Sequence, residues 1–204
     1  MKILKNFGTF KILTPRSELK KQLLRIERAG RTCYRSQTGR ISEVSAKNFV
    51  EMLLKRGHES VIEHSSMTVK FMKVSRGFTH EIVRHRLASF SQESTRYVDY
   101  ARTGDCSSLD LDSMEIHVII PPHRDKYEKI KMDDGNLISL SEMLENIESY
   151  YRALRKDGWN PEDARQILPI GIEAHIVITA NFREWRHVFT LRTSKPAHWE
   201  IRAV

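Results

Sequence analysis

The chain has 204 residues, of which 40% are hydrophobic and 29% are charged, and its formal net charge is +8. This length suits one domain with a core of its own, and the composition excludes a disordered or collagen-like chain. The positive charge favours anionic partners, either nucleic acid or anionic small molecules, and does not choose between them.

Two helices are predicted in the first third of the chain. Apolar residues at helical spacing predict a helix over 15–29, with Gly30 as its stop. The same spacing predicts a second helix over 42–56, ended by Gly57 where a left-handed cap is needed. The histidine-containing segment 58–64 follows directly at the exit of this helix.

The middle of the chain changes from a strand signal to a helix signal. Alternating apolar residues predict a strand over 66–73, which Arg76 and Gly77 interrupt. Residues 78–88 are expected to be helical, and the serine-rich segment that follows is expected to form a polar loop because its hydroxyl groups compete for backbone hydrogen bonds. Residues 84–86 would then lie near the end of that helix.

Further along, β-branched residues predict a strand over 114–120, which runs into a proline turn. The charged stretch 126–136 is expected to be an exposed excursion. A long amphipathic helix is predicted over 139–156, because Ser139 and Glu142 have the spacing of a capping box.

The last quarter of the chain contains a third strand signal between two helices. A helix of about two turns is predicted from Asn160, as its cap, to Pro169. A strand is predicted over 172–179, and a helix over 181–191 with Glu184 in the capping-box position. We therefore expect an α+β fold class, with a central mixed or antiparallel sheet flanked by helices, as a single domain over 1–204.

The sequence lacks a membrane span and a signal peptide, and this suggests the cellular compartment of the protein. No apolar run reaches the ~18 residues of a membrane span, and the N-terminus lacks a signal-peptide core with a small-residue cleavage site. Cys33 and Cys106 are far apart and form no Cys-x-x-Cys pair, so neither a disulfide framework nor a thiolate zinc site is indicated. We expect a cytoplasmic protein with free thiols and no membrane contact.

The most informative motif is Arg84-His85-Arg86, which is followed after seven residues by Ser94 and then by Arg96. Arginine carries a permanent charge and a planar fork of donors that matches phosphate oxygens two at a time. Because consecutive helical residues are rotated by about 100°, Arg84 and Arg86 would point about 200° apart on a helix. They suit a helix end or two ligands, and we predict a nucleotide phosphate as a ligand.

A second basic cluster is formed by Asn181, Arg183, His187 and Arg192, with Arg165 upstream. Arg183 and His187 are four residues apart and share a helix face, while Asn181 begins the helix, where backbone donors and the dipole favour anions. This pattern predicts a second anion-binding surface. For both clusters the alternative is a solvated basic face without a ligand.

Other chemistries are disfavoured. His80 and His85 are five residues apart, about 140° out of register on a helix, so they do not form a zinc-protease motif. We expect no metal site. No G-x-S-x-G elbow surrounds Ser94, and no glycine-rich phosphate loop occurs, so arginine must hold the phosphate.

At these residues the chain resembles the flavin-dependent thymidylate synthases, whose signature is Arg-His-Arg, seven residues and then Ser. The resemblance extends to AGRTCYRS, GHESVIEH, ARQILP, NFREWRH and LRTSKPAHWEI, in the right order between Gly30 and Ile201. It implies a methyltransferase that converts dUMP to dTMP, with 5,10-methylenetetrahydrofolate as the carbon donor and NADPH or NADH as the reductant through bound FAD. It also implies the family fold and a homotetramer with shared active sites, without a nucleic-acid partner.

The resemblance also implies roles for individual residues. The FAD contacts would be Ser60, Glu63, Arg84, His85, Arg86, Asn181, Arg183 and His187. The dUMP contacts would be Glu81, Arg84, Gln92, Ser94, Thr95, Arg96, Arg165 and Arg192. The candidate catalytic residues are Arg192 at the uracil carbonyls, His58 beside the flavin and folate, and Ser94 as a phosphate binder rather than a nucleophile.

Two other hypotheses remain. A basic nucleic-acid-binding protein would explain the charge and the aromatic residues near the arginines, and it predicts salt-steep polynucleotide binding without flavin. Family members usually continue past HWEI into a C-terminal helical segment, so a nucleotide-binding member without turnover is the third hypothesis. The aromatic residues themselves stack on a base or flavin, or belong to the core. They are Phe90, Tyr97, Trp185 and Phe189.

Overall fold

The computed structural model describes residues 1–5, 8–36, 39–101 and 116–204. The strands are β1 (Lys2–Lys5), β2 (Thr9–Ile12), β3 (Ser66–Ser75), β4 (Ala88–Gln92), β5 (His117–Ile120), β6 (Lys129–Lys131), β7 (Leu137–Ser139) and β8 (Glu173–Asn181). The α-helices are α1 (Arg16–Cys33), α2 (Glu43–Lys55), α3 (Arg76–Ile82), α4 (Leu140–Lys156), α5 (Pro161–Ala164), α6 (Phe182–Arg192) and α7 (Trp199–Ala203), with 3-10 helices η1 (Glu59–His64) and η2 (Arg165–Ile167). Cys106 and the start of the strand predicted over 114–120 lie outside the described residues.

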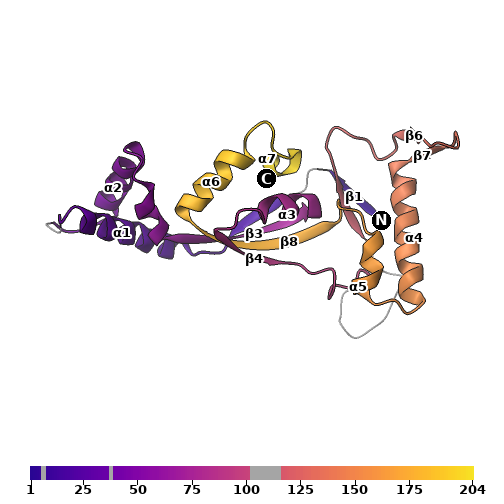
Figure 1. Ribbon diagram of the computed structural model, residues 1–204, viewed down its shortest axis with the longest axis horizontal. Helices are drawn as coiled ribbons and strands as arrows, with labels where there is room; N and C mark the ends of the chain where they lie inside the picture. The colour runs from indigo at the N-terminus through magenta and orange to yellow at the C-terminus, as the bar shows by residue number, and fades with distance from the viewer. Residues whose placement is uncertain (6–7, 37–38, 102–115) are drawn as a thin grey trace.

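The centre of the molecule is a four-stranded antiparallel sheet with the order β2-β3-β8-β4. Its two long strands pair from Ser66 with Asn181 to Ser75 with Glu173, across a bulge between Phe71 and Val74. Every second residue of β8 is buried, and helices α3, α6 and α7 cover that face (Figure 1). The predicted α+β class, with an antiparallel sheet flanked by helices, is confirmed.

The molecule is elongated, with α1 and α2 at one end, the sheet in the middle and α4 at the other end (Figure 1). Each part has its own cluster of buried apolar residues, around Ile26, Ile176 and Tyr151 respectively. Parallel pairing of β1 with β5, and a bridge between Val118 and Ile172, link the α4 end to the start of β8. None of the described helices is long and apolar enough to cross a membrane.

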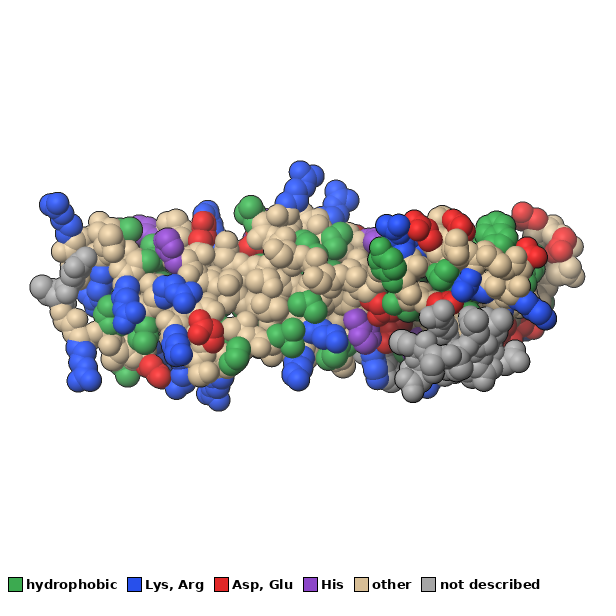
Figure 2. Space-filling view, turned by 90° about the horizontal axis from the view of Figure 1, so that it is seen from below, with side chains coloured by type: hydrophobic (Ala, Val, Ile, Leu, Met, Phe, Trp, Pro, Cys, Tyr) green, Lys and Arg blue, Asp and Glu red, His purple; other side chains and the backbone are tan. Residues whose placement is uncertain are grey.

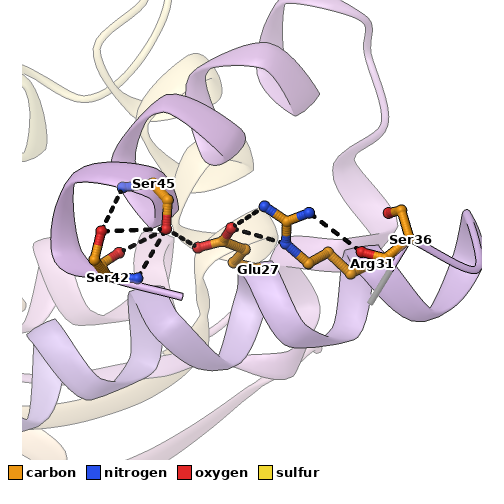
Figure 3. Close-up of polar contacts among 5 residues, drawn as sticks. All are labelled: Glu27, Arg31, Ser36, Ser42 and Ser45. Atoms are coloured by element: carbon orange, nitrogen blue, oxygen red, sulfur yellow. Dashed lines mark hydrogen bonds and ion pairs between the residues drawn. The ribbon is translucent and has the colours of Figure 1, made fainter. Parts of the chain in front are cut away.

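A polar network centred on the buried Glu27 joins α1 to the start of α2 (Figure 3). The carboxylate of Glu27 accepts hydrogen bonds from Arg31 Nε at 2.9 Å and from Ser45 Oγ at 2.8 Å. Ser45 also forms a capping box with Ser42, and Arg31 Nη1 donates to the carbonyl of Ser36 at 3.2 Å. The network therefore fixes both the α1–α2 contact and the turn that follows α1.

Gly30 was predicted to end the first helix, and this was wrong, because α1 continues to Cys33. Gly30 is buried inside the helix, where a Cβ would lie only 2.4 Å from Cε1 of Phe49 on α2. The glycine is needed for the close approach of two helices. By contrast, Gly57 has the predicted left-handed conformation after α2, with φ of +71°.

Gly30→Ala is expected to destabilise the protein by about 1–2 kcal/mol, because overpacking costs roughly 1–3 kcal/mol and the gain in helix propensity is at most about 1 kcal/mol. Urea unfolding measures the change. Arg28→Ala, at an exposed position of the same helix, is the control and should shift stability by less than about 0.5 kcal/mol. A Gly30→Ala protein as stable as the wild type would contradict the close contact.

The segment around the Arg-His-Arg motif differs from the prediction. Helix α3 spans Arg76–Ile82 instead of 78–88, because Ser75 Oγ accepts from the backbone N–H of Phe78 and starts the helix earlier. The predicted polar loop, which starts at Ser89, is wrong over residues 89–92, because Ala88–Gln92 forms the edge strand β4. Its serines lie on the exposed side of that strand.

Two further differences concern the α4 end. The predicted exposed excursion over 126–136 is confirmed as exposed, and it contains β6 and the turn that leads to the paired strand β7. The two-turn helix predicted from Asn160 is only one turn of α-helix followed by η2, and the Asn160 side chain makes no capping bond. The capping box of Ser139 and Glu142 at the start of α4 is confirmed.

Candidate functional site

A cavity of about 920 Å³ lies between α6, η1 and the turn that follows α3. Its volume is within the range of about 300–1,000 Å³ typical of ligand pockets. The lining residues are Glu59, Glu63, Arg84, His85, Arg86, Leu87, Asn181, Arg183, Glu184, Arg186, His187, Thr190, Leu191 and Arg192. The two basic motifs of the sequence therefore meet in one cavity.

The strand pairing explains why these motifs meet. Ala88 at the start of β4 pairs with Ala180 near the end of β8. In an antiparallel pair, the residues that precede one strand and follow the other lie at the same end. The Arg-His-Arg turn therefore faces the first turn of α6, although almost a hundred residues separate them in the sequence.

The cavity is electropositive, with five arginines against three glutamates in its lining. Asn181 caps α6 as predicted, because its Oδ1 accepts from the backbone N–H of Glu184 at 2.8 Å. Arg183 forms an ion pair with Glu63 of η1, and Arg186 forms one with Glu59 at 3.1 Å. Exposed ion pairs of this kind contribute little to stability, so these guanidinium groups can turn to an anionic ligand.

A series of side-chain contacts, buried at Glu184 and His85, joins three residues of the cavity lining to Glu81. Glu184 Oε1 lies 3.1 Å from Nδ1 of His85, and both residues are buried. On the other side of the ring, Arg192 Nε donates to His85 Nε2 at 3.0 Å. The Arg192 guanidinium also donates through Nη2 to the carbonyl of Glu81 at 2.6 Å, and through Nη1 to the Glu81 carboxylate.

His85 is a neutral imidazole in this arrangement. Its burial, followed by the charge of Arg192, lowers its pKa below the ordinary value of 6.5, against the opposing effect of Glu184. A guanidinium can only donate, so His85 Nε2 accepts from Arg192 and the ring proton lies on Nδ1. The Glu184 carboxylate accepts a hydrogen bond from this Nδ1–H, instead of completing the predicted capping box.

The lowered pKa of His85 predicts a pH effect on stability. Between the folded pKa and 6.5 the unfolded chain binds more protons than the folded chain, so the free energy of unfolding falls as the pH drops through this window. His85→Gln should therefore lose less stability than the wild type between about pH 7.5 and about pH 5, measured by urea unfolding. The exposed control His123→Gln should follow the wild type, and parallel curves for wild type and His85→Gln would disprove the shift.

Ser60 and His58 were predicted to contribute to the site, but neither lines the cavity. Ser60 is exposed on η1. His58 occupies the position before its first turn, and its Nδ1 lies 2.7 Å from the hydroxyl of Tyr34, with the two rings stacked. The roles given to Ser60, as an FAD contact, and to His58, beside the flavin and folate, therefore remain predictions.

The remaining predicted substrate residues form a second group. Gln92 Nε2 donates to Thr79 Oγ1 at 2.8 Å, and Arg165 Nη1 donates to Thr95 Oγ1 at 3.2 Å. Arg96 forms an exposed ion pair with Glu162 at 2.9 Å. Ser94 Oγ accepts from the backbone N–H of Arg96 at 3.2 Å. None of these residues lines the cavity.

The sheet topology explains this separation too. The second group follows the end of β4 and precedes the start of β8, whereas the cavity lies where β4 starts and β8 ends. With a rise of about 3.4 Å per residue, the five residues of β4 place the two groups on the order of 14 Å apart. In one chain, the predicted dUMP residues are thus divided between two places.

Sequence reasoning missed four residues of this region. Glu59 and Arg186 form an ion pair that was not anticipated, Tyr34 contacts His58, and Glu184 was assigned only to a helix cap. The motifs that contain them, AGRTCYRS, GHESVIEH and NFREWRH, were recognised, but the partners of the individual side chains depend on pairing between distant segments.

The aromatic and histidine alternatives are resolved residue by residue. Trp185 is buried and its Nε1 donates to the carbonyl of Met67 at 3.0 Å, which assigns it to the core, whereas Phe189 and Tyr97 are exposed. His175 is partly exposed, with Nε2 at 3.2 Å from Glu173. Within the described ranges, no group of three or more His, Cys, Asp or Glu residues is arranged to hold a metal ion.

Space-filling colouring shows how the charge is distributed on one long face of the molecule (Figure 2). Lysine and arginine side chains gather over the half that contains α1, α2 and the middle of the sheet, while acidic side chains are more frequent near α4. On this face, positive side chains are therefore more frequent away from the α4 end.

A protein-family model and several named proteins match most of this sequence. The model of the family described as thymidylate synthase complementing protein matches residues 17–204. The flavin-dependent thymidylate synthase of Pyrococcus furiosus is 37% identical over 169 residues, which cover 81% of this chain and 62% of that protein. The enzyme of the same name from Geobacter sulfurreducens is 34% identical, over 86% of this chain and 71% of that protein.

The fold has a solved counterpart. The crystal structure of thymidylate synthase X from Helicobacter pylori, with FAD and dUMP, superimposes with a TM-score of 0.67 and 20% identity. The match covers 96% of this chain and 88% of the other. The chain spans about 62% of the length of the Pyrococcus relative. On the family model and these identities, the chain belongs to the family of flavin-dependent thymidylate synthases.

Proposed function

We propose that this chain is an FAD-dependent thymidylate synthase, which converts dUMP to dTMP with 5,10-methylenetetrahydrofolate as the carbon donor and NADPH or NADH as the reductant. The observation that carries the proposal is the convergence of the Arg-His-Arg turn and the NFREWRH helix on one electropositive cavity, in a chain of this family. Relatives with this name match most of the chain.

The donors of the cavity suit FAD. Arg84, Arg86 and Arg183 supply guanidinium groups for the diphosphate, and the capped N-terminus of α6 at Asn181 favours the same charge. His187 provides an imidazole beside His85 at a ring distance of 5.6 Å. When bound, FAD supplies the hydride transfer that begins at the nicotinamide, and the protein orients the reactants.

Arg192 is the residue that acts on the pyrimidine in this proposal. Carbon 5 of uracil is a poor nucleophile, and it becomes reactive only with enolate character, which places negative charge on the neighbouring carbonyl oxygen before carbon 5 attacks. A guanidinium fixed beforehand stabilises that charge without reorganising in the reaction. The contacts of Arg192 with His85 and Glu81 hold it in this way, and its side chain remains 16% exposed.

The second group of residues suits the phosphate of dUMP. Arg96 and Arg165 carry the charge, with Gln92, Ser94 and Thr95 as neutral partners. Because this group lies on the order of 14 Å from the cavity in one chain, we propose that a second copy supplies it. A homotetramer with active sites between subunits would bring the two groups together. His58, stacked on Tyr34, would lie toward the folate.

The visible absorption spectrum tests the proposal most cheaply. Purified protein, mixed with FAD and then desalted, should retain the flavin absorption bands, and dUMP should change the rates at which the flavin is reduced and reoxidised. Arg84→Ala should weaken flavin retention, whereas Arg124→Ala, an exposed arginine paired with Glu128, should not. Failure of the wild-type protein to retain flavin, together with salt-steep binding to polynucleotide, would favour the nucleic-acid-binding alternative.

A further inference from the structure

Glu184 is the first member of a series of contacts that runs through His85 to Arg192. It is 5% exposed and His85 is 4% exposed, so the contact of 3.1 Å between them is shielded from water. A buried carboxylate is costly unless it accepts hydrogen bonds. Here Oε1 accepts one from the Nδ1–H of His85, which lies on the turn after α3.

The chemistry of Arg192 and Glu184, the two outer members of this series of contacts, fixes the direction of each hydrogen bond. Arg192 Nε can only donate, so Nε2 of His85 must be the acceptor in their 3.0 Å contact. The neutral ring then carries its proton on Nδ1, and a carboxylate is the acceptor that favours this tautomer. Removing the acceptor at Glu184 would let the ring protonate at Nε2 or rotate, and Arg192 Nε would lose its partner.

We propose that Glu184 is a positioning residue, which accepts the Nδ1 proton of His85, turns Nε2 toward Arg192 and so fixes the guanidinium for the uracil carbonyl of dUMP. The identity of the ligand rests on the proposed function, whereas the arrangement of the three side chains does not. The geometry makes Arg192 depend on a residue that lies on its own helix, eight positions earlier, through a histidine from a distant turn.

Two substitutions separate positioning from a merely structural role. Glu184→Met has a similar length and no acceptor, and it should raise the KM for dUMP roughly tenfold, the size expected for one lost hydrogen bond that involves a charged group. Glu184→Gln retains an acceptor oxygen and should restore the KM to within about threefold of the wild type, by the same reasoning. Equal effects of both substitutions, or an unchanged KM in Glu184→Met, would overturn the proposal.

A double-mutant cycle tests whether Glu184 acts through Arg192. Arg192→Lys removes the Nε donor but keeps the charge. If the effect of Glu184 passes through that donor, adding Glu184→Met to Arg192→Lys should change dUMP affinity by less than about twofold, because the two effects are not additive. If the two substitutions instead change dUMP affinity independently, so that their fold-changes multiply, Glu184 does not act through Arg192 and the proposal is contradicted.

Nuclear magnetic resonance decides the tautomer without any enzymatic assay. In full-length protein labelled with ¹⁵N at histidine, the His85 signals can be assigned by their loss in His85→Gln. We expect Nδ1 to be protonated in the wild type and in Glu184→Gln, and a mixture of tautomers in Glu184→Met. A proton on Nε2 of wild-type His85 would overturn the proposal, whether or not the protein forms dTMP. The expected tautomer in a protein that forms no dTMP would contradict only the proposed function.

Discussion

Arg192→Ala is expected to lower kcat/KM for dUMP by about 100- to 1,000-fold, the range observed when one fixed donor to developing negative charge is removed. Arg192 is held by His85 and by both the carbonyl and the carboxylate of Glu81, so its guanidinium is oriented before a ligand binds. An alanine leaves neither the charge nor the donors.

Steady-state kinetics with varied dUMP measures this effect. Arg124→Ala is the matched control, because Arg124 is exposed near β6 and pairs with Glu128 at 3.0 Å. It should leave kcat/KM within about twofold of the wild type, as expected for a surface substitution. An Arg192→Ala enzyme with wild-type kinetics and intact flavin binding would remove Arg192 from the site.

Asp99→Ala is expected to lower the free energy of unfolding by about 3–5 kcal/mol, the cost of leaving one member of a buried ion pair without its partner. The Asp99 carboxylate accepts from Arg155 Nε at 3.1 Å and Nη2 at 2.6 Å, and Arg155 is only 12% exposed. It also accepts from the N–H of Ala101 at 3.0 Å and from the hydroxyl of Tyr151 at 3.4 Å.

Burial next to Asp99 raises the pKa of Tyr151 to about 12, so this phenol stays a donor at any working pH. Urea unfolding followed by circular dichroism measures the change in stability. Asp133→Ala, in the exposed turn between β6 and β7, should change it by less than about 0.5 kcal/mol.

Asp99→Ala also tests a second point. We propose that residues 1–204 unfold as one domain, so the whole transition should move to lower urea. A loss below about 1 kcal/mol would contradict the cost of the buried pair. A shift confined to part of the signal would contradict the single domain.

Local signals explain which elements could be predicted from the sequence. The capping box of Ser139 and Glu142 and the cap at Asn181 involve groups three residues apart, and both form as predicted. The hydroxyl of Ser75 also acts locally, but its effect on the start of α3 was missed because Arg76-Gly77 was interpreted as a break. The sequence around Ser75 was therefore sufficient to predict the start of α3, and only its interpretation was wrong.

Pairing between distant segments explains the other differences. The start of the serine-rich segment belongs to the strand at 88–92, because β8, more than eighty residues later, offers a free edge. Gly30 does not end α1, because Phe49 of another helix packs on it. Neither partner is visible in the local pattern, and tertiary contacts override propensity at both positions.

The same distinction applies to the candidate site. The sequence motifs identified most of the cavity lining, including the Arg-His-Arg turn and Arg183. They did not reveal that Glu184 contacts His85, which is 99 residues away, or that Arg165 contacts Thr95, which is 70 residues away. They also placed all dUMP residues in one set, whereas the antiparallel pairing of β4 with β8 divides them between two ends of the sheet.

The formation of dTMP is the most direct test of the proposed function. The purified 204-residue chain would be incubated with FAD, NADPH, 5,10-methylenetetrahydrofolate and dUMP, and the nucleotides separated by chromatography. We expect dTMP to form in the complete mixture and not when FAD or the folate is omitted. Protein that binds FAD and dUMP but yields no dTMP in the complete mixture would contradict the assigned activity.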